Sequence, residues 1–443
     1  MSENMVTLLT EKRTHEIRSV IDELNAVDIA ALFEELDAEN DVLLFRLLPK
    51  ELAATVFSYL PIEQQEDIVN SLSDPELSRI VNDLYTDDAV DFLEEMPASV
   101  VKRVLNAANE ETRKQINHLL QYPENSAGSV MTTEFVGLKR NMTVADTFAY
   151  IRRNGKDKET IYTCYVTDQT RVLVGYVTVR KLLLCDEAQT IGDIMEEHTI
   201  FATTNEDRED VAIKVRKYGL TAIPVVDNEG RLVGIITVDD IMDVAEQENT
   251  EDFQLMAAVA PSEEPYLKTG VLEHARRRTP WLLLLMISGT FTGLIISSYE
   301  AAFTAVPILV NAIPMLMDTG GNAGSQSSTL IIRGIALGEL SLKNWATTVW
   351  KELRISALVG AGLAIVNIVR IYIIDKNMPF AITVGITLWA TVIFAKTIGC
   401  TLPLLAKKVK LDPAIMASPL ITTIVDAISL TIYFSIATML MGL

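Results

Sequence analysis

The chain has 443 residues and a formal net charge of -21, so it is too long for a single core and acidic overall. The charge is uneven, with a net -27 over residues 1–275 and a net +6 over residues 276–443. Nucleic-acid binding needs clustered Lys and Arg, so the acidic half argues against a nucleic-acid partner. That half fits cation binding or simple solubility.

The cysteines favour a reducing compartment for the acidic half. Cys164, Cys185 and Cys400 are the three cysteines, and they lie far apart in the sequence. No disulfide framework or CxxC metal site is present, which favours a cytosolic location. The N-terminal segment has no apolar run, so no cleaved signal peptide is predicted.

Residues 1–124 are predicted to form an all-α domain of short amphipathic helices. The segments that begin at Asp28 and Asp87 are similar, and Leu–Pro or Met–Pro pairs recur three times where Pro would close a helix. This recurrence predicts a helical-repeat superhelix. Its acids include Asp87, Asp88 and Asp91, which by themselves favour a solvated surface over a binding site.

A repeat of about 60 residues follows the helical domain. Asp168, Gly175 and Thr178 each have an identical residue 59 positions later. The repeated runs are rich in β-forming residues, flank turn residues and lead into helices. Two α/β units are therefore predicted, at 125–190 and 191–247.

A connecting helix rich in acids is predicted after the second repeat, and the segment 248–275 is expected to join the two halves. Several of its carboxylates share one helix face, where like charges destabilise a helix by about 0.2–0.5 kcal/mol per pair. A helix selected for stability alone would avoid this, so the pattern favours cation capture. The acids are Asp240, Asp243, Glu246, Glu248, Glu251 and Asp252.

Residues 276–443 are predicted to form an α-helical transmembrane domain with five spans, because about 20 apolar residues suffice to cross a bilayer. The predicted spans are 281–299, 301–317, 355–374, 377–395 and 413–443. Lys and Arg cluster before the first span, between the second and third, and between the fourth and fifth. This distribution places the acidic half inside the cell and the C-terminus outside.

A Gly-rich stretch at 314–328 is the first candidate for chemistry within the membrane. One proline and three glycines argue against a continuous helix there, and irregular backbone in a bilayer is tolerated only where it is buried or lines water. Its side-chain oxygens would then line an ion path; the alternative is a packing seam of small residues. The candidate ligands are Asn322, Ser325, Gln326 and the adjoining Thr329.

Asp426, near the middle of the last span, is the second candidate. A carboxylate at this depth is costly and is functional by default. Mg²⁺ usually keeps several waters while meeting one or two carboxylates, so a sparse site suits it. The alternative is an aspartate neutralised by a lysine such as Lys396.

Taken together, these features resemble the MgtE-type magnesium transporter family over nearly the whole chain. The most specific marks are the sequence GGNAGSQ at 320–326 and Asp412-Pro-Ala followed by Pro419 and Asp426. Within this resemblance, the 59-residue repeat is a pair of CBS domains. The expected fold is a multidomain membrane protein with an all-α helical-repeat N domain, an α/β tandem CBS pair and a five-span helical domain.

The resemblance implies a homodimer in the lipid bilayer with a pore along the dimer axis. Asp426 would face the pore and bind hydrated Mg²⁺, and the connecting helix would act as a plug. Cytosolic Mg²⁺ would bridge acidic surfaces and close the pore. The matching sensor positions are Asp240, Asp243, Glu248, Glu251 and Asp252, with Asp87, Asp88 and Asp91 as partners.

The sequence departs from the family pattern at two places. Ser325 and Ser418 stand where some relatives carry Asn, which leaves the inner ligands of the pore ion open. Some CBS pairs of this family bind ATP through an Asp after the first repeat's turn, and Lys181 stands there in this chain, while the second repeat keeps Asp240. The resemblance therefore gives no basis for predicting an ATP site.

The expected function is Mg²⁺ import across the cell membrane through a pore that intracellular Mg²⁺ closes. A coupled secondary transporter of divalent cations and a membrane-tethered CBS sensor remain alternatives. An enzyme is not expected, because the four histidines are scattered and no nucleophile–His–acid set is apparent. Selectivity among Mg²⁺, Mn²⁺, Co²⁺ and Ni²⁺ is left open, since all accept oxygen ligands.

Overall fold

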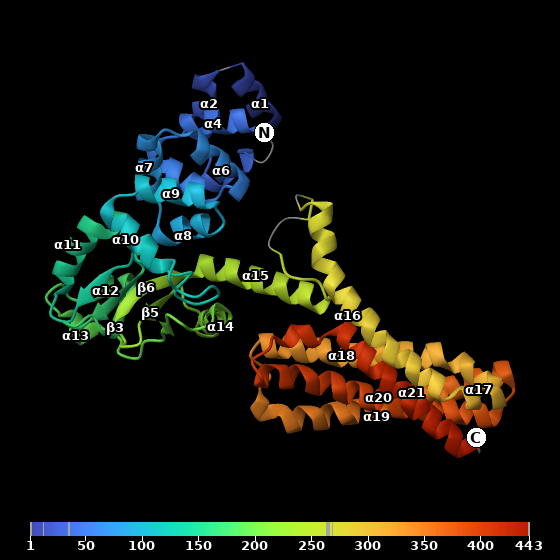
Figure 1. Cartoon of the computed structure of the whole chain (residues 1–443). Helices are drawn as coiled ribbons and strands as arrows, with labels where there is room; N and C mark the ends of the chain where they lie inside the picture. Colours follow the sequence, from blue (N-terminus) through green and yellow to red (C-terminus); the bar gives the residue numbers. More distant parts are fainter. Residues whose placement is uncertain (1, 12, 34–35, 263–265, 268, 442–443) are drawn as a thin grey trace. The chain divides into compact units, whose positions relative to one another are not determined.

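The structure, a computed structural model, describes residues 2–11, 13–33, 36–262, 266–267 and 269–441 (Figure 1). Parts of the predicted N domain, connecting segment and final span (1, 12, 34–35, 263–265, 268 and 442–443) lie outside the described residues. The chain forms two compact units, Met1–Ala245 and Glu246–Leu443. The boundary falls inside helix α15 (Val238–Met256), which also runs without a break through the domain boundary predicted at 247/248.

The first unit begins with short helices that form the predicted all-α domain. They are α1 (Ser2–Thr10), α2 (Thr14–Ile21), α3 (Ala26–Phe33), α4 (Ala38–Leu47), α5 (Lys50–Ser58), α6 (Ile62–Ser71), α7 (Asp74–Asp83), α8 (Thr86–Glu94), α9 (Ala98–Ala107) and α10 (Glu110–Leu119). Pro49, Pro61 and Pro97 each occupy the N-cap position of the next helix. There a proline costs no helical hydrogen bond, so each Pro separates two helices without a long loop.

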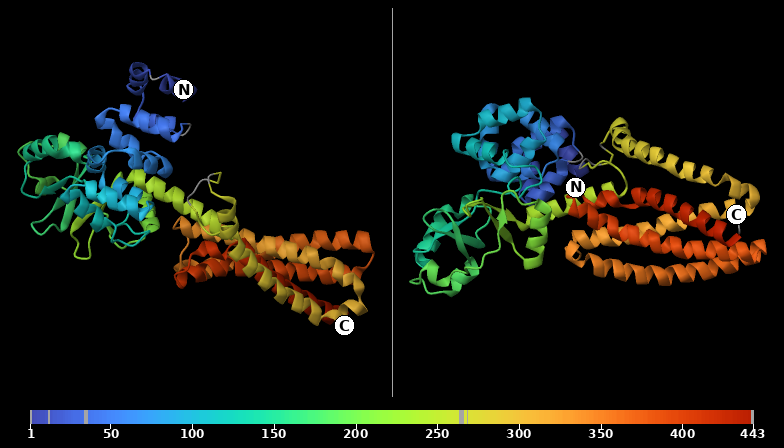
Figure 2. Two further views of the ribbon diagram at one scale, coloured as in Figure 1. Left: turned by 45° about the horizontal axis from the view of Figure 1, so that its top comes forward. Right: turned by 60° about the horizontal axis from the view of Figure 1, so that its bottom comes forward.

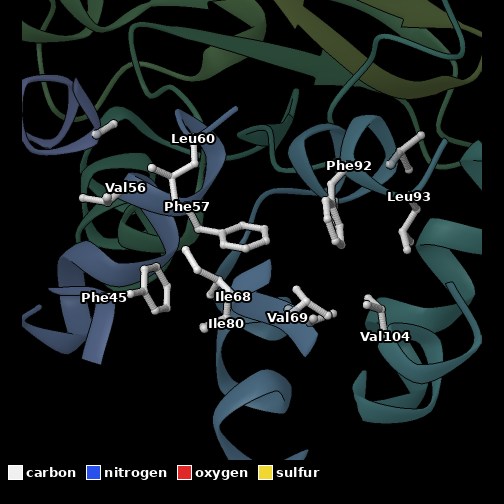
Figure 3. Close-up of a cluster of buried hydrophobic side chains, with 14 of the residues drawn as sticks. Phe45, Val56, Phe57, Leu60, Ile68, Val69, Ile80, Phe92, Leu93 and Val104 are labelled. Carbon is white, nitrogen blue, oxygen red and sulfur yellow. The ribbon is translucent and has the colours of Figure 1, made fainter. Parts of the chain in front are cut away.

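Most of these helices pack on the helix two places further along the chain, as in α3 on α5 and α5 on α7. Figure 3 shows the apolar core that this arrangement buries. Phe57 of α5 lies at its centre, with its ring centroid 6.1 Å from that of Phe45 and 5.2 Å from that of Phe92, both edge to face. The arrangement confirms the predicted helical repeat.

The two α/β repeats complete the first unit. Their elements are β1 (Gly137–Lys139), α11 (Val144–Asn154), β2 (Thr163–Thr167), β3 (Leu173–Thr178) and α12 (Val179–Leu184), then α13 (Ile191–Ile194), β4 (Ala202–Thr203), α14 (Arg208–Tyr218), β5 (Ala222–Val226) and β6 (Leu232–Thr237). Each sheet has one parallel and one antiparallel pair, in the orders β1-β2-β3 and β4-β5-β6. Each β2–β3 residue pair recurs in β5–β6 with both partners 59 positions later, which confirms the repeat residue by residue.

The segment that opens each repeat pairs with the sheet of the other repeat. Thr132 bridges to Ile235 of β6, and Glu196 bridges to Tyr176 of β3. A Cβ on Gly175 or Gly234 would lie 2.7 Å from the carbonyl oxygen of the incoming segment, so only glycine permits this approach. The two repeats are therefore folded as one pair.

The second unit is a helical bundle (Figure 2). Beyond the end of α15 it contains α16 (Val271–Ser298), α17 (Glu300–Ala305), the 3₁₀ turn η2 (Pro307–Ala312), α18 (Ile313–Ala336), η3 (Leu342–Asn344), α19 (Trp345–Asp375), α20 (Met378–Lys408), η4 (Pro413–Met416) and α21 (Ser418–Met441). Within the described part of the chain, four helical segments are long and apolar enough to cross a membrane: 271–298, 342–375, 378–408 and 413–441. α18 is less apolar, but its 24 residues would reach about 36 Å, enough for a fifth span.

The second predicted span and the predicted break after it are both wrong. Residues 301–317 form a short helix, a 3₁₀ turn and the start of α18, whereas the Gly-rich stretch lies inside the continuous α18. Pro314 sits in the first turn of that helix, where its missing N–H costs nothing. The glycines serve packing: a Cβ on Gly324 would lie 2.7 Å from Ile421, and one on Gly399 would lie 2.2 Å from the carbonyl oxygen of Gly324.

Candidate functional site

The predicted pore ligands of α18 lie along one face of that helix. Asn322, Gln326 and Thr329 follow one another at helical spacing, and all three are exposed. Ser325 is partly buried, and its Oγ lies 2.8 Å from the Oγ of Ser418 at the start of α21. We call these residues, together with Thr422 and Asp426 of α21, the polar stripe.

Asp426 lies on α21 two turns beyond Ser418, with Thr422 between them at four-residue spacing. Its side chain is half-buried, and in the described part of the chain its Oδ1 is buried without a hydrogen-bond partner. Thr422 packs on Gly321, so Asp426 belongs to the contact between α18 and α21. The structure thus brings all six predicted pore residues to one pair of helices.

Lys396 has a different partner from the one considered in the sequence. Its Nζ lies 3.4 Å from the Oγ of Ser327, which in turn donates a hydrogen bond of 2.7 Å to Glu352. All three residues are at least nine-tenths buried. Lys396 therefore belongs to a buried polar group between α18, α19 and α20, and the Asp426–Lys396 alternative loses its support.

A first group of acids lies within the first unit, where α8 meets the start of α15. The residues that interact electrostatically are Asp87, Asp88 and Asp91 of α8 with Asp240 of α15. Burial, followed by the charge of Asp240, raises the pKa of Asp88 to about 6 and that of Asp91 to about 7, although Asp91 keeps solvent contact. We call this group the inter-domain acids.

Asp87 and Asp240 are the most constrained of the inter-domain acids. Asp87 is 7% exposed, and burial together with the charge of Asp240 raises its pKa well above the usual range. Asp240 accepts hydrogen bonds from the backbone N–H and the hydroxyl of Thr237 in a capping arrangement at the start of α15. Burial nevertheless raises the Asp240 pKa to about 6. Such a group holds protons, or needs a cation, near neutral pH.

Two further acids join this group, and sequence reasoning missed both. Burial and the charge of Asp240 raise the pKa of Glu159 to about 8, and its Oε2 is buried without a hydrogen-bond partner in the described residues. Glu134 accepts a hydrogen bond of 2.6 Å from the Thr86 hydroxyl and one of 2.7 Å from that of Thr132. Both glutamates lie in loops of the first repeat, where no sequence pattern marks them.

A second group of acids lies within the second unit, and we call it the mouth acids. Burial raises the pKa of Asp252 to about 6, and the charges of Asp412, Glu248 and Glu251 add to the effect. Next to it, Leu255 packs on Ile332 of α18 and on the η4 turn that precedes α21. The end of the connecting helix therefore adjoins the Ser325–Ser418 end of the polar stripe. Asp243 is exposed on the first unit and completes the predicted sensor set.

The chemistry of these sites is that of hard oxygen donors. Carboxylates, hydroxyls and amides suit Mg²⁺ and similar cations, and no Cys or His belongs to any of the groups. Within the described ranges, no three acidic, Cys or His side chains converge closely enough to hold a metal directly. Sparse carboxylates of this kind are suited to an ion that keeps much of its water shell.

The fold and these sites define the class of the protein: a multidomain membrane protein whose acidic helical domain and CBS-like pair precede a helical bundle with a polar stripe. The family model described as divalent cation transporter matches residues 313–436. The MgtE intracellular N domain matches 24–125, and the CBS domain matches 127–186 and 191–246.

Known magnesium transporters are similar in sequence to this chain over most of its length. "Magnesium transporter MgtE" of Thermus thermophilus is 36% identical over 80% of this chain and 78% of that protein. The protein of the same name from Enterococcus faecalis is 36% identical over 74% of this chain and 72% of that protein. A crystal structure of the cytosolic domain of the Mg²⁺ channel MgtE in complex with ATP is 36% identical, covers 55% of this chain and 100% of that one, and superposes with a TM-score of 0.52. The chain belongs to the MgtE family of divalent cation transporters.

Proposed function

We propose that the chain is a Mg²⁺ channel or transporter of the cell membrane that intracellular Mg²⁺ closes. The polar stripe is the observation that carries the proposal. It places Asn322, Gln326 and Thr329 on the exposed surface of a membrane helix, next to the half-buried Asp426. Exposure of these groups to lipid would be costly, so the stripe must face water or another protein surface.

The simplest way to shield the polar stripe from lipid is an interface with a second copy of the chain. In a two-fold dimer the stripes of both copies would line one path, and two Asp426 side chains would meet a hydrated divalent cation there. The chain's own bundle leaves the stripe open, as the exposure of Asn322 and Thr329 indicates. We therefore propose a homodimer with the ion path at its interface.

The acids supply the sensor in this proposal. The inter-domain acids crowd like charges between α8 and α15, and the mouth acids do the same beside η4. Bound Mg²⁺ would relieve the repulsion and favour the packed arrangement. The ion can close the pore only if it binds the closed state more tightly than the open one.

The proposed orientation places the first unit in the cytosol. Arg276, Arg277 and Arg278 lie in the N-terminal part of α16, and Lys407 and Lys408 end α20, so both clusters would face the cytosol under the positive-inside rule. If α18 is also a span, the chain crosses the membrane five times, and its C-terminus lies outside the cell.

ATP is bound by the relative whose structure matches, and we do not extend that ligand to this chain. Lys181 at the diverging position forms an ion pair of 2.5 Å with Glu196 of the second repeat. Asp240 at the corresponding position caps α15 and interacts with the inter-domain acids. Enzymatic activity is not part of the proposal, since the family is one of transporters.

The testing experiment is Mg²⁺ flux into proteoliposomes for the wild type and Asp426→Ala, at several internal Mg²⁺ concentrations. We expect wild-type flux that falls as internal Mg²⁺ rises, and flux at least tenfold lower for Asp426→Ala. Asp375→Ala is the matched control, because Asp375 is exposed at the end of α19, outside the stripe. Equal flux in the wild type and Asp426→Ala would mean that the ion path does not pass Asp426.

Two outcomes would favour the alternatives. Absence of wild-type flux would favour the membrane-tethered sensor. Flux that requires a counter-ion gradient would favour a coupled transporter. Competition by Mn²⁺, Co²⁺ and Ni²⁺ in the same assay measures selectivity.

The sensor assignment has its own test. Neutralising Asp243, Glu248, Glu251 and Asp252 together should leave flux high at internal Mg²⁺ concentrations that close the wild type. A second variant, with Asp88→Asn and Asp240→Asn, tests the contribution of the inter-domain acids separately from that of the mouth acids. If both variants close at the wild-type concentration, the acids do not sense Mg²⁺.

A further inference from the structure

The chain reverses direction directly after α15, in a closed turn at residues 257–262 that we call the linker turn. The backbone N–H groups of Ala257, Ala258 and Val259 bond back to carbonyl oxygens of the last turn of α15, at 2.9–3.2 Å. Ala258 adopts the left-handed conformation, with a φ of 56°. This conformation is unfavourable for a residue other than glycine, so contacts elsewhere must hold the linker turn.

Gln254 of α15 holds the linker turn from one side. Its Nε2 donates a hydrogen bond of 2.8 Å to the carbonyl oxygen of Ser262, and its Oε1 accepts one of 2.6 Å from the Ser262 N–H. The linker turn is therefore fixed to the end of α15. The same end carries Asp252 of the mouth acids and packs Leu255 on Ile332 and η4.

Arg277 of α16 holds the linker turn from the other side. Its Nη1 donates a hydrogen bond of 2.9 Å to the carbonyl oxygen of Pro261, and its own carbonyl oxygen accepts one of 3.1 Å from the Ala260 N–H. Glu273, one helical turn earlier, orients the guanidinium through an ion pair of 2.8 Å with Nε. The planar guanidinium serves both side-chain partners at once, which a lysine cannot do. We call the contacts of Arg277 with Ala260 and Pro261 the clamp.

The local sequence explains why α16 accepts a contact at this level. Pro280 lies inside the helix, three residues after Arg277. A proline there removes one helical hydrogen bond and opens the preceding turn, so carbonyl oxygens of that turn become accessible to donors from outside the helix. Arg276 and Arg278 are exposed, whereas Arg277 is half-buried. Arg277 thus differs from its two neighbours in its contacts and not in its charge.

We propose that Arg277 is a positioning residue for closure, which fixes the linker turn to α16 and thereby holds the mouth acids beside η4. This inference rests on the proposed function, in which the packed arrangement of the acids is the closed one. Opening breaks the clamp, because the end of α15 leaves η4 while α16 stays in the membrane. Without the clamp, the closed state loses a charge-assisted hydrogen bond relative to the open state. Closure then requires a higher internal Mg²⁺ concentration.

The test measures flux at several internal Mg²⁺ concentrations for the wild type, Arg277→Ala and Arg277→Lys. We expect the internal Mg²⁺ concentration that halves flux to rise at least fivefold for Arg277→Ala, as the loss of a hydrogen bond from a charged group predicts. Arg277→Lys keeps the charge but not the planar geometry and should raise it two- to fivefold. Flux without internal Mg²⁺ should stay within twofold of wild type, because Arg277 lies outside the polar stripe.

Arg276→Ala and Arg278→Ala are the matched controls, since each removes one exposed positive charge from the same turn of α16. Both should keep the wild-type half-closing concentration. A shift as large in either control as in Arg277→Ala would assign the effect to surface charge and overturn the clamp. An unshifted Arg277→Ala, or one without flux at any internal concentration, would also overturn it. Wild-type flux that still falls with internal Mg²⁺ would leave the proposed function intact in each case.

Maleimide labelling of Ala260→Cys provides a readout independent of flux, in the full chain without its three native cysteines and with Mg²⁺ present. Ala260 is half-buried in the linker turn. Adding Arg277→Ala should make labelling at least fivefold faster, because the linker turn is released from α16, whereas adding Arg278→Ala should leave the rate unchanged. Equal labelling rates with and without Arg277→Ala overturn the clamp, even if no flux is measurable.

Discussion

Carboxylates in the first unit differ sharply according to their surroundings. Glu76 and Asp146 are solvent-exposed helix-capping residues, and hydrogen bonds from Ser73 and Thr143 hold their pKa values below the usual range. Asp41, by contrast, is 2% exposed in α4, and its Oδ1 has no hydrogen-bond partner in the described residues. The same side chain therefore stabilises the fold at one position and opposes it at another.

Asp41→Asn should make the protein more stable at neutral pH. Burial, and then the charges of Asp67 and Asp37, raise the pKa of Asp41 to about 6. The folded state thus binds this proton more tightly than the unfolded state, so the penalty appears as pH rises from about 4 and is complete above 6. We expect a gain of about 2 kcal/mol at pH 7.5 that disappears towards pH 4.

Thermal unfolding of the full chain in detergent at pH 7.5 and pH 5 measures the gain. Asp83→Asn, at an exposed position that ends α7, is the control and should change little at either pH. A variant no more stable than wild type at pH 7.5 would show that Asp41 carries no such penalty.

Sequence reasoning found the candidate site residue whose energetic cost is visible in the sequence alone. Asp426 stood out because a carboxylate inside an apolar run is unusual. Glu134 and Glu159 were missed because no sequence pattern marks an acid in a loop that meets another domain.

At the scale of single elements, α18 differs most from expectation. Glycines usually argue against a helix, and here they lie inside one because α20 and α21 approach its backbone. The packing-seam interpretation of these glycines is correct, and the polar side chains between them still form the exposed stripe. One helix therefore combines a packing face and a candidate pore face.

Gly399→Ala should destabilise the bundle strongly. Its Cβ would lie 2.2 Å from the carbonyl oxygen of Gly324, a backbone atom that cannot move without shifting α18. We expect a loss of about 3 kcal/mol, measured by unfolding in detergent. Gly362→Ala is the control, because no atom lies within 4 Å of its Cβ position, and it should be neutral or stabilising. Equal stability of the two variants would contradict the close crossing of α18 and α20.

The buried group of Lys396, Ser327 and Glu352 should behave as a unit. Removing either charge leaves the other buried without its partner, which costs about 3–5 kcal/mol. We expect Lys396→Met and Glu352→Gln each to lower Tm strongly, and the double variant to lose less than their sum by about 1–2 kcal/mol. Strict additivity would mean that the two charges do not interact through Ser327.

At the scale of the whole molecule, acids gather at two places in two separate compact units. The inter-domain acids lie between α8 and the start of α15, and the mouth acids lie where the end of α15 meets η4. α15 belongs to both units, since their boundary falls within it. A single helix therefore links the two charge groups, as the proposed sensor would require.

Cysteines placed in the polar stripe should cross-link two copies of the chain. In a background without Cys164, Cys185 and Cys400, Asn322→Cys and Thr329→Cys should form a covalent dimer under mild oxidation, because both positions are exposed on α18. Leu358→Cys, 77% exposed on the apolar α19, is the control and should cross-link less. Gel mobility measures the cross-linking. If both stripe variants remained monomers, the proposal of a pore at the dimer interface would be wrong.

The sequence by itself determined the features that depend on local pattern. Apolar length predicted the membrane domain, the 59-residue identity predicted the paired sheets, and the spacing of Pro and apolar residues predicted the helical repeat. The tertiary structure alone decided two others: the continuity of α18 and the partner of Lys396. Each depends on contacts between helices distant in the chain, and those contacts set whether a glycine permits packing and whether a charge is paired.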